Sequence, residues 1–230
     1  MAKTKDFVAD ASHELRTPLA VIQTNLELVM GNPKETVEEQ KEWLKNIEIE
    51  VSHMTRLVED SLFLARVDSE QQLLNKSYFS LDKAIDQVVK PLIPMANNKD
   101  IKLIVEVEPE VDYYGDEKRM SQLILILLDN AIKHTPIHGE VRLKMRTIGN
   151  TIEILVLDTG EGIEEQHLDK IFERFYRIDK ARVKSIEGTG LGLSIANWII
   201  KIHKGSISVS SIPGKETAFT IRLPKENKLI

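Results

Sequence analysis

Hydrophobic residues near the start of the chain recur at alternating steps of three and four positions. They are Val8, Ala11, Leu15, Leu19, Ile22, Leu26 and Val29. This spacing predicts an amphipathic helix with a coiled-coil seam. The sequence Gly31-Asn32-Pro33 ends the helix, because glycine and asparagine accept left-handed geometry and proline cannot continue the hydrogen-bond ladder.

A second seam with the same spacing follows the turn, at Leu44, Ile47, Val51, Met54, Val58, Ser61 and Ala65. Two antiparallel helices cannot by themselves bury both seams and the flanking Leu57, Leu62 and Leu64. Pairing with a second copy into a four-helix bundle solves this. We therefore expect an all-α helical hairpin over residues 1–73 that forms a homodimer.

The hydrophobic pattern changes after the second helix. Residues 74–80 are polar and lack the heptad steps, which indicates a linker, and residues 81–230 are expected to form an α/β domain. Its short turns predict an antiparallel or mixed sheet with helices on one face. The expected helices are 82–96, 116–134, short ones within 164–175, and 191–203; the expected strands are 101–107, 140–147, 151–158, 206–211 and 218–223.

Composition narrows the class of protein. The chain has 230 residues, 42% hydrophobic and 29% charged, with no cysteine, which indicates one large or two modest folded domains and excludes a disulfide scaffold. Of the net charge of -5, residues 1–70 carry -6 and the rest about +1. Neither part has the clustered basic face of a nucleic-acid-binding protein. No apolar run is long enough to cross a bilayer, so we expect the chain as given to be soluble.

One polar stretch of the first predicted helix does not fit a purely structural hairpin. His13 lies between the seam positions Ala11 and Leu15, so its imidazole is expected to face solvent, with Glu14 beside it. Pro18 follows in mid-helix, where a proline costs about 3 kcal/mol. An exposed imidazole next to a carboxylate is a candidate nucleophile. The alternative, which the seam alone would favour, is a dimerisation stalk without chemistry.

Glycines cluster in the second domain. Five of the eleven fall in two segments, Asp158-Thr159-Gly160-Glu161-Gly162 and Gly188-Thr189-Gly190-Leu191-Gly192. Glycine lets a backbone approach a ligand closely and leaves N–H groups free for phosphate oxygens, most strongly where a helix begins. Neither segment is a Walker A sequence, and no βαβ unit of a Rossmann fold surrounds them. Two flexible loops are the alternative.

Three polar residues near these loops suggest what they bind. The carboxylate of Asp158, at a predicted strand end, can accept a hydrogen bond from an exocyclic amine such as that of adenine. Asn130 and Lys133, on the helix before it, offer an amide oxygen for a metal and a cation for phosphate oxygens. Together with the glycines they predict a nucleotide site, although Asn130 alone would read as a helix-surface amide.

The order and spacing of five segments resemble the H, N, G1, F and G2 boxes of sensor histidine kinases, and the segments are SHELRTPL (12–19), LLDNAIKHT (127–135), DTGEGI (158–163), IFERFY (171–176) and GTGLGLSIA (188–196). The closing GKETAFTIRLP looks like the last strands of the family. The resemblance spans almost the whole chain. It implies a dimerisation and histidine phosphotransfer hairpin, followed by the Bergerat ATP-binding fold, an α/β sandwich shared with Hsp90, gyrase and MutL.

The resemblance also implies roles for single residues. His13 matches the autophosphorylated histidine, Glu14 the acid that orients or deprotonates it, and Thr17 the residue implicated in dephosphorylating a response regulator. Asn130 matches the Mg²⁺ ligand. The other implied nucleotide contacts are Lys133, His134, Asp158, Gly160, Gly162, Gly188, Thr189, Gly190, Leu191 and Gly192. Arg174 and Arg177 are candidates for γ-phosphate contact or for docking on the helices, with solvated surface charges as the alternative.

Two positions depart from the family pattern. Ile126 stands where the N box usually has a second asparagine, so one metal or water-orienting contact is missing or comes from another group such as Gln122 or Asp129. His134 replaces the usual aromatic. An ATPase clamp of the Hsp90/MutL kind needs a glutamate at the position of Ile126, which argues against that reading. A pseudokinase scaffold gains some weight from Ile126 but not from the intact boxes.

The resemblance therefore implies a protein-histidine kinase that uses ATP and Mg²⁺, phosphorylates His13 and passes the phosphoryl group to an aspartate of a response regulator, with phosphatase activity toward that partner. Because Met1 lies close to the H box, we expect a cytoplasmic part of a longer chain anchored in the plasma membrane.

Overall fold

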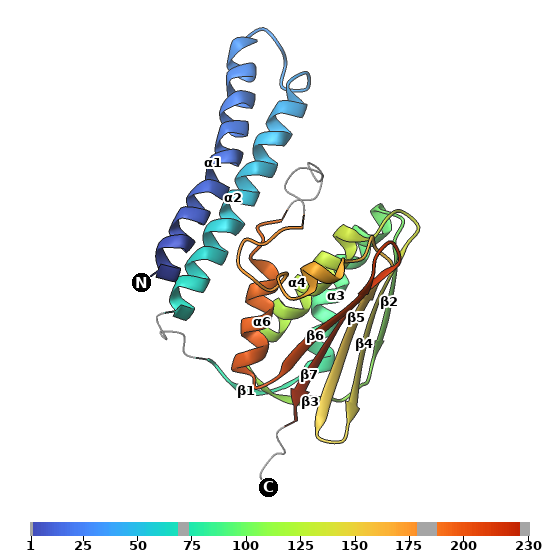
Figure 1. The fold of residues 1–230 in the computed structure, drawn as a ribbon. Helices are drawn as coiled ribbons and strands as arrows, with labels where there is room; N and C mark the ends of the chain where they lie inside the picture. Colours follow the sequence, from blue (N-terminus) through green and yellow to red (C-terminus); the bar gives the residue numbers. More distant parts are fainter. Residues whose placement is uncertain (1, 69–73, 179–187, 226–230) are drawn as a thin grey trace. The chain divides into compact units, whose positions relative to one another are not determined.

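The computed structural model describes residues 2–68, 74–178 and 188–225, and for residues 2–10 it describes the backbone alone. The chain divides into two compact units, which are described separately: residues 1–72 with 181–192, and residues 73–180 with 193–230 (Figure 1).

The first unit is a hairpin of two long helices, α1 (Ala2–Gly31) and α2 (Lys41–Asp68). The side-chain amide of Gln40 donates to the carbonyl oxygens of Val29 at 3.0 Å and Asn32 at 2.9 Å. These bonds satisfy backbone acceptors that the end of α1 leaves open. Pro18 lies inside α1, as predicted, and its side chain is buried. The predicted seam position Val8 lies outside the described side chains.

The hairpin buries less of its apolar seam than it exposes. Leu57 and Leu64, which the sequence places beside the seam, are 1% and 2% exposed. The seam residues Leu19, Leu26 and Val51 instead remain 55%, 46% and 48% exposed. One hairpin thus leaves a large apolar stripe in water, which agrees with the expectation that two helices cannot bury both seams.

The second unit contains a five-stranded mixed sheet with the order β2-β4-β5-β7-β6. Its strands are β2 (Lys102–Val107), β4 (Glu140–Ile148), β5 (Thr151–Asp158), β6 (Ser206–Ile212) and β7 (Glu216–Pro224). Strand β2 pairs parallel with β4, and the other pairs are antiparallel. The helices α3 (Leu81–Asn98), α4 (Glu117–His134) and α6 (Gly192–Ile202) cover one face (Figure 1).

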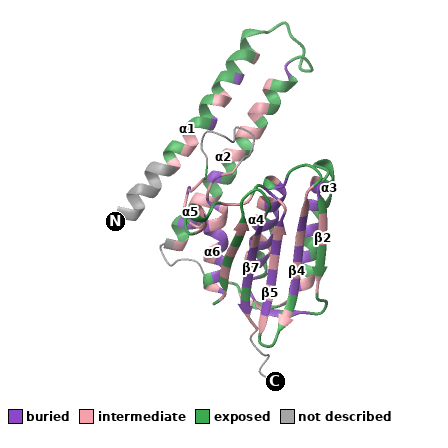
Figure 2. Cartoon of the chain, turned by 45° about the vertical axis from the view of Figure 1, so that its right-hand side comes forward, coloured by how far each residue is buried: buried purple, intermediate pink, exposed green. Residues whose placement is uncertain are grey.

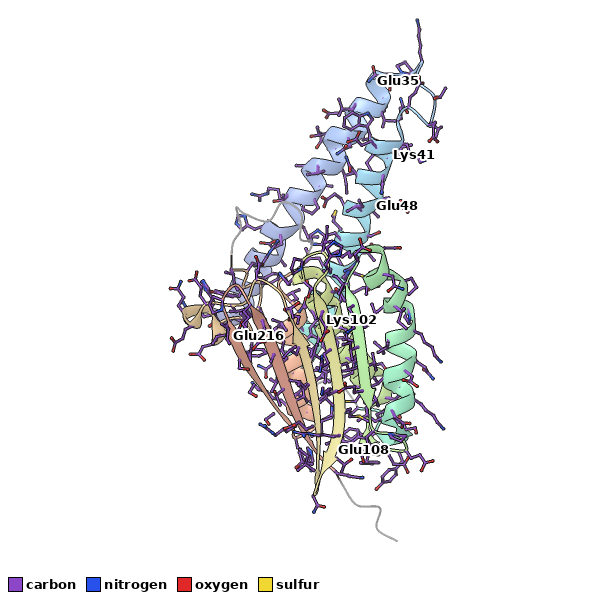
Figure 3. The ribbon with its side chains drawn as sticks, turned by 90° about the vertical axis from the view of Figure 1, so that its right-hand side faces the viewer. Glu35, Lys41, Glu48, Lys102, Glu108 and Glu216 are labelled. Atoms are coloured by element: carbon purple, nitrogen blue, oxygen red, sulfur yellow. The ribbon has the colours of Figure 1, made fainter. Side chains whose placement is uncertain are left out.

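The core lies between this sheet and the helices. Alternate residues of the central strands are buried, as the period of two requires, among them Val141, Leu143, Ile152 and Ile154 (Figure 2). The opposite face is polar, with the Glu153 carboxylate held by the guanidinium groups of Arg146 at 2.7 Å and Arg222 at 3.1 Å. Figure 3 shows Lys102 and Glu108 at the two ends of β2. The mixed sheet with helices on one face confirms the predicted fold class.

Two features differ from the sequence prediction. The expected linker 74–80 contains a strand, β1 (Ser77–Ser80), which pairs antiparallel with β3 (Asp112–Gly115), a strand that the sequence did not predict. The expected short helices within 164–175 reduce to α5 (Glu165–Leu168) followed by turns. Among the described residues no helix is long and apolar enough to span a membrane.

Candidate functional site

The candidate phosphoacceptor lies on the exposed side of α1. His13 and Thr17 are exposed and Glu14 is half-buried. Within the described part of the chain the His13 imidazole makes no hydrogen bond, so Glu14 does not hold its ring in this conformation. The imidazole is therefore open to an incoming group.

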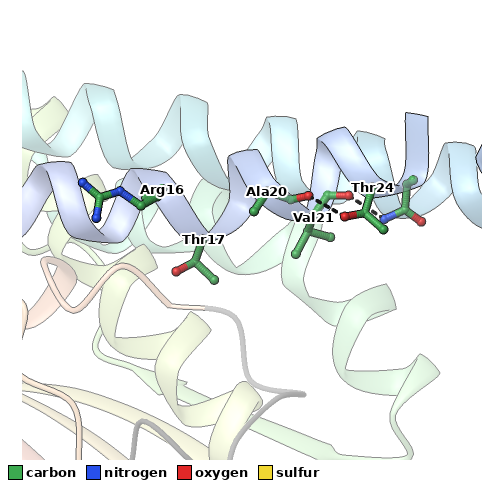
Figure 4. Close-up of a pocket in the computed structure, with 6 residues that line it drawn as sticks. Arg16, Thr17, Ala20, Val21 and Thr24 are labelled. Atoms are coloured by element: carbon green, nitrogen blue, oxygen red, sulfur yellow. Dashed lines mark hydrogen bonds between the residues drawn. The ribbon is translucent and has the colours of Figure 1, made fainter. Parts of the chain in front are cut away.

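A hollow on the same helix begins one turn after His13 (Figure 4). It is lined by Arg16, Thr17, Ala20, Val21, Thr24 and Asn25. The hydroxyl of Thr24 donates to the Ala20 carbonyl at 3.0 Å, whereas the Thr17 hydroxyl has no hydrogen-bond partner among the described residues. Thr17 thus does not cap the bend by bonding an upstream carbonyl, which was the structural alternative for this residue.

The last turns of α4 carry the predicted metal ligand and cation. The Lys133 ammonium lies 2.6 Å from the Asp129 carboxylate, and their side chains are 17% and 28% exposed. The Asn130 side chain is half-exposed and, among described residues, has no hydrogen-bond partner. A free amide oxygen can coordinate a hard cation, and Asp129 beside it neutralises the charge of Lys133. Ile126 is half-buried one turn earlier.

Asp158 ends β5 in an unusual electrostatic environment. The residue is 4% exposed, and its Oδ1 accepts a hydrogen bond from the Gly160 N–H at 2.9 Å. Burial raises the pKa of the Asp158 carboxyl from 3.8 to about 6, although the Gly160 bond favours the charged form. The carboxylate therefore has spare acceptor capacity in a desolvated position, so a further hydrogen-bond donor would stabilise its charged form.

The loop after Asp158 packs tightly against the end of α4. A Cβ built on Gly160 would lie 2.6 Å from the His134 carbonyl oxygen and 2.6 Å from Asp158 Oδ1. Gly162 has φ +71°, and a Cβ there would lie 2.4 Å from the Ile212 carbonyl oxygen. Only glycine fits either position. His134 Nδ1 lies 3.4 Å from Glu161 Oε1. The structure thus brings Asn130, Lys133, His134, Asp158, Gly160 and Gly162 to one end of α4.

The F-box segment has two features that the sequence did not reveal. Phe175 is 8% exposed and has φ 60°, a left-handed conformation that costs a non-glycine residue about 1–3 kcal/mol. The Tyr176 hydroxyl and His167 Nδ1 lie 2.6 Å apart. Arg174 and Arg177 are half-exposed and each has an interaction partner. The local sequence does not predict the left-handed conformation of Phe175, because tertiary packing imposes it.

The second glycine loop leads directly into α6. Thr189 and Leu191 are buried, and the Leu191 N–H donates to Thr189 Oγ1 at 3.3 Å. Gly188, Gly190 and Gly192 are half-exposed, and Gly192 is the first residue of α6. Residues 188–192 belong to the first compact unit, so the structure does not bring them together with Asp158 in one unit.

Comparisons with known families agree with both units. Residues 3–70 match the family described as His Kinase A (phospho-acceptor) domain, and residues 115–227 match histidine kinase-, DNA gyrase B- and HSP90-like ATPases. The phosphate regulon sensor protein PhoR of Pseudomonas aeruginosa is 32% identical over 216 residues, which are 94% of this chain and 49% of that protein. The sensor protein SrrB of Staphylococcus aureus is 35% identical over 221 residues, 96% of this chain and 38% of that protein. The chain thus spans about half, or less, of these relatives.

Solved structures show the same architecture. The histidine kinase AdeS of Acinetobacter baumannii has a TM-score of 0.75 and 26% identity, with 94% of this chain and 98% of that chain covered. The histidine kinase ThkA, solved in complex with the response regulator protein TrrA, has a TM-score of 0.74 over 96% of this chain and 61% of that chain, and its 23% identity supports the fold alone. The two family matches, the relatives and the shared architecture show that this chain belongs to the two-component sensor histidine kinases.

Proposed function

We propose that the chain is a protein-histidine kinase, in which residues 1–73 present His13 and residues 81–230 bind ATP, with 74–80 between them. The observation that carries the proposal is Asp158: a buried carboxylate with unused acceptor capacity, beside a loop where a Cβ would collide with the end of α4. Such a group suits the exocyclic amine of adenine, since a donor from a ligand offsets the cost of its desolvation.

The rest of the site suits the phosphates. Lys133 is the cation for their oxygens, which would replace Asp129 as its partner. The free Asn130 amide is the group that would hold Mg²⁺, and the described residues contain no cluster of three acidic or histidine side chains that could hold it instead. When bound, the ion would offset negative charge on the phosphates. We propose that further residues also contact the nucleotide. They are His134, Gly160, Gly162, Arg174, Gly188, Thr189, Gly190, Leu191 and Gly192.

The proposed chemistry is transfer of the γ-phosphoryl group to His13. The bond between γ-phosphorus and the bridging oxygen breaks, its electron pair leaves with ADP, and a P–N bond forms to an imidazole nitrogen. The exposure of His13 on α1 permits this attack. Glu14 would hold the proton on the other ring nitrogen after a change of rotamer. The product is a phosphoramidate, whose lability suits onward transfer to an aspartate of a response regulator.

We propose a response regulator as partner because the chain belongs to the two-component sensor histidine kinases. A protein of the same fold, the histidine kinase ThkA, was solved in complex with the response regulator protein TrrA. We propose that Thr17 also aids hydrolysis of the phosphoaspartate. Its hydroxyl is exposed, lies one turn beyond His13 and, among the described residues, is without a hydrogen-bond partner. A hydroxyl in that state can position a water molecule.

A homodimer is supported by the apolar surface of the hairpin. Large apolar side chains that are 38–73% exposed occur along both helices, and they are Leu19, Leu26, Leu28, Met30, Leu44, Val51, Val58 and Leu62. A second hairpin would cover this surface in a four-helix bundle.

Incubation of the chain with γ-labelled ATP and Mg²⁺ tests the proposal against its competitors. Acid-labile, base-stable label on the protein supports the kinase. Released phosphate without labelled protein would indicate an ATPase clamp. Neither product would indicate a scaffold, the reading that Ile126 favours because its side chain offers no polar atom.

A further inference from the structure

The segment that follows the hairpin is fastened to the second unit at a buried polar cluster. The backbone N–H of Asn75 donates to Asp116 Oδ2 at 3.1 Å. The Lys76 ammonium lies 3.5 Å from the carbonyl oxygen of Ile202, at the last residue of α6. Directly afterwards β1 pairs with β3, in a register that sets Ser77 opposite Gly115. The chain therefore enters this unit between the start of α4 and the end of α6.

Asp116 has two tasks at once. It is the N-cap of α4, where its Oδ1 accepts from the Arg119 N–H at 3.2 Å while Oδ2 holds Asn75. Because each oxygen serves a different segment, the position of the linker and the first turn of α4 are tied through one carboxylate, which is 8% exposed.

His203 completes the cluster. Its ring is 3% exposed, its Nε2 accepts the Asp116 N–H at 3.0 Å, and its Nδ1 donates to the Ile199 carbonyl at 2.7 Å. Both bonds require the neutral ring in one tautomer, and burial lowers the pKa of His203 below its ordinary 6.5. A Cβ on Gly115 would lie 2.9 Å from His203 Cδ2, so the backbone passes directly over the ring. His203 thus locks the end of α6 to the start of α4.

The opposite ends of both helices carry proposed nucleotide residues. Helix α4 has 18 residues, or a length of about 27 Å, and its last turns present Asn130 and Lys133. Helix α6 begins at Gly192, the last glycine of the second loop. A helix is stiff along its axis, so a shift at one end reaches the other.

We propose that Asp116 and His203 form a clasp that couples the attachment of residues 74–80 to nucleotide binding, as positioning residues rather than catalytic ones. The inference rests on the proposed nucleotide site. Coupling between two sites is reciprocal: if nucleotide tightens the clasp, loosening the clasp weakens nucleotide binding by the same factor.

Hydrogen exchange of the whole chain, with and without the ATP analogue AMPPNP and Mg²⁺, tests the clasp. The amides of residues 75–80 are expected to exchange more slowly when the analogue is bound. In Asp116→Asn the side chain keeps only one acceptor oxygen, so the N–H of either Asn75 or Arg119 loses its hydrogen bond. The slower exchange at residues 75–80 with the analogue should then disappear, and the affinity for AMPPNP should fall about fivefold. Glu117→Gln removes a negative charge from the next residue, which is exposed, and should behave like the wild type.

The outcomes separate the clasp from the nucleotide site. Protection at residues 158–162 without any change at 75–80 would overturn the clasp and leave the nucleotide site standing. Unchanged AMPPNP affinity in a folded Asp116→Asn would also overturn it. No protection at residues 158–162 would overturn the nucleotide site and the clasp together. Should Asp116→Asn not fold, Lys76→Ala leaves the helix cap intact and must show the same loss of slowing for the clasp to hold.

Discussion

Replacement of Asp158 by asparagine gives a prediction with a calculable magnitude. The pKa of the carboxyl rises from 3.8 to about 6 in the folded protein because burial penalises its charged form. A shift of about 2 units corresponds to about 3 kcal/mol at roughly 1.4 kcal/mol per unit. In the nucleotide-free protein at pH 7 the charged Asp158 therefore opposes folding by about this amount.

The sign follows from proton binding. Between pH 3.8 and about 6 the folded state holds more protons on Asp158 than the unfolded state, so this group lowers stability as pH rises through that window and has its full cost above it. Asparagine has no such charge. The stability of Asp158→Asn relative to the wild type should therefore increase by up to about 3 kcal/mol between pH 4 and pH 7, whatever the constant effect of the amide.

Urea unfolding of the nucleotide-free chain at several pH values measures this difference, with the exposed Asp169→Asn as control. AMPPNP affinity is measured in parallel and should fall in Asp158→Asn, since the new amide presents a donor to the adenine amine. A stability difference that does not change with pH would refute the electrostatic argument. Unchanged affinity with lower stability would make Asp158 a structural residue.

Three further substitutions test neighbouring parts of the account. Thr17→Ala should lose phosphatase activity toward a phosphorylated regulator and keep autophosphorylation. The control Thr24→Ala should keep both activities, because the Thr24 hydroxyl is bonded to the helix backbone. Loss of both activities in Thr17→Ala would mean that Thr17 serves the structure of the helix. Gly160→Ala should lower stability by about 1–3 kcal/mol in thermal unfolding, because its Cβ would lie 2.6 Å from the His134 carbonyl oxygen. Gly31→Ala is the control, since nothing lies within 4 Å of a Cβ at that position, and equal Tm values for the two variants would contradict the close approach. Ile126→Asn should raise or leave unchanged the Mg²⁺ affinity, measured by calorimetry in the presence of nucleotide. A sharp loss of activity in Ile126→Asn, but not in the control Leu125→Asn at an exposed position, would mean that Ile126 packs in a core that tolerates no polar atom.

The sequence predicted the elements whose signals are local. The hydrophobic periodicity of α4 and the alternation of β4 and β5 place these elements within one or two residues of their observed bounds. The predicted exposure of His13 is confirmed, since its position between seam residues decides which side of the helix it occupies.

The missed features depend on distant contacts. Strands β1 and β3 have four residues each, too few for a clear alternation, and they pair across more than thirty positions of sequence. Leu57 and Leu64 are buried while the seam residues Leu19, Leu26 and Val51 are exposed, and the periodicity of a single helix does not distinguish these positions. The left-handed Phe175 and the raised pKa of Asp158 arise from packing around them, which no local pattern records.

The central claim is that His13 accepts the phosphoryl group, and the hairpin provides its own control. His53, on α2, is the other histidine of the hairpin. It is half-buried with Nδ1 3.7 Å from Glu50 Oε2, so His53→Gln changes the same residue type in the same hairpin. The chain, His13→Gln and His53→Gln are incubated with γ-labelled ATP and Mg²⁺, and acid-labile label is counted after binding of AMPPNP has been shown for each. We expect label on the wild type and on His53→Gln and none on His13→Gln. Label that persists in His13→Gln would contradict the account.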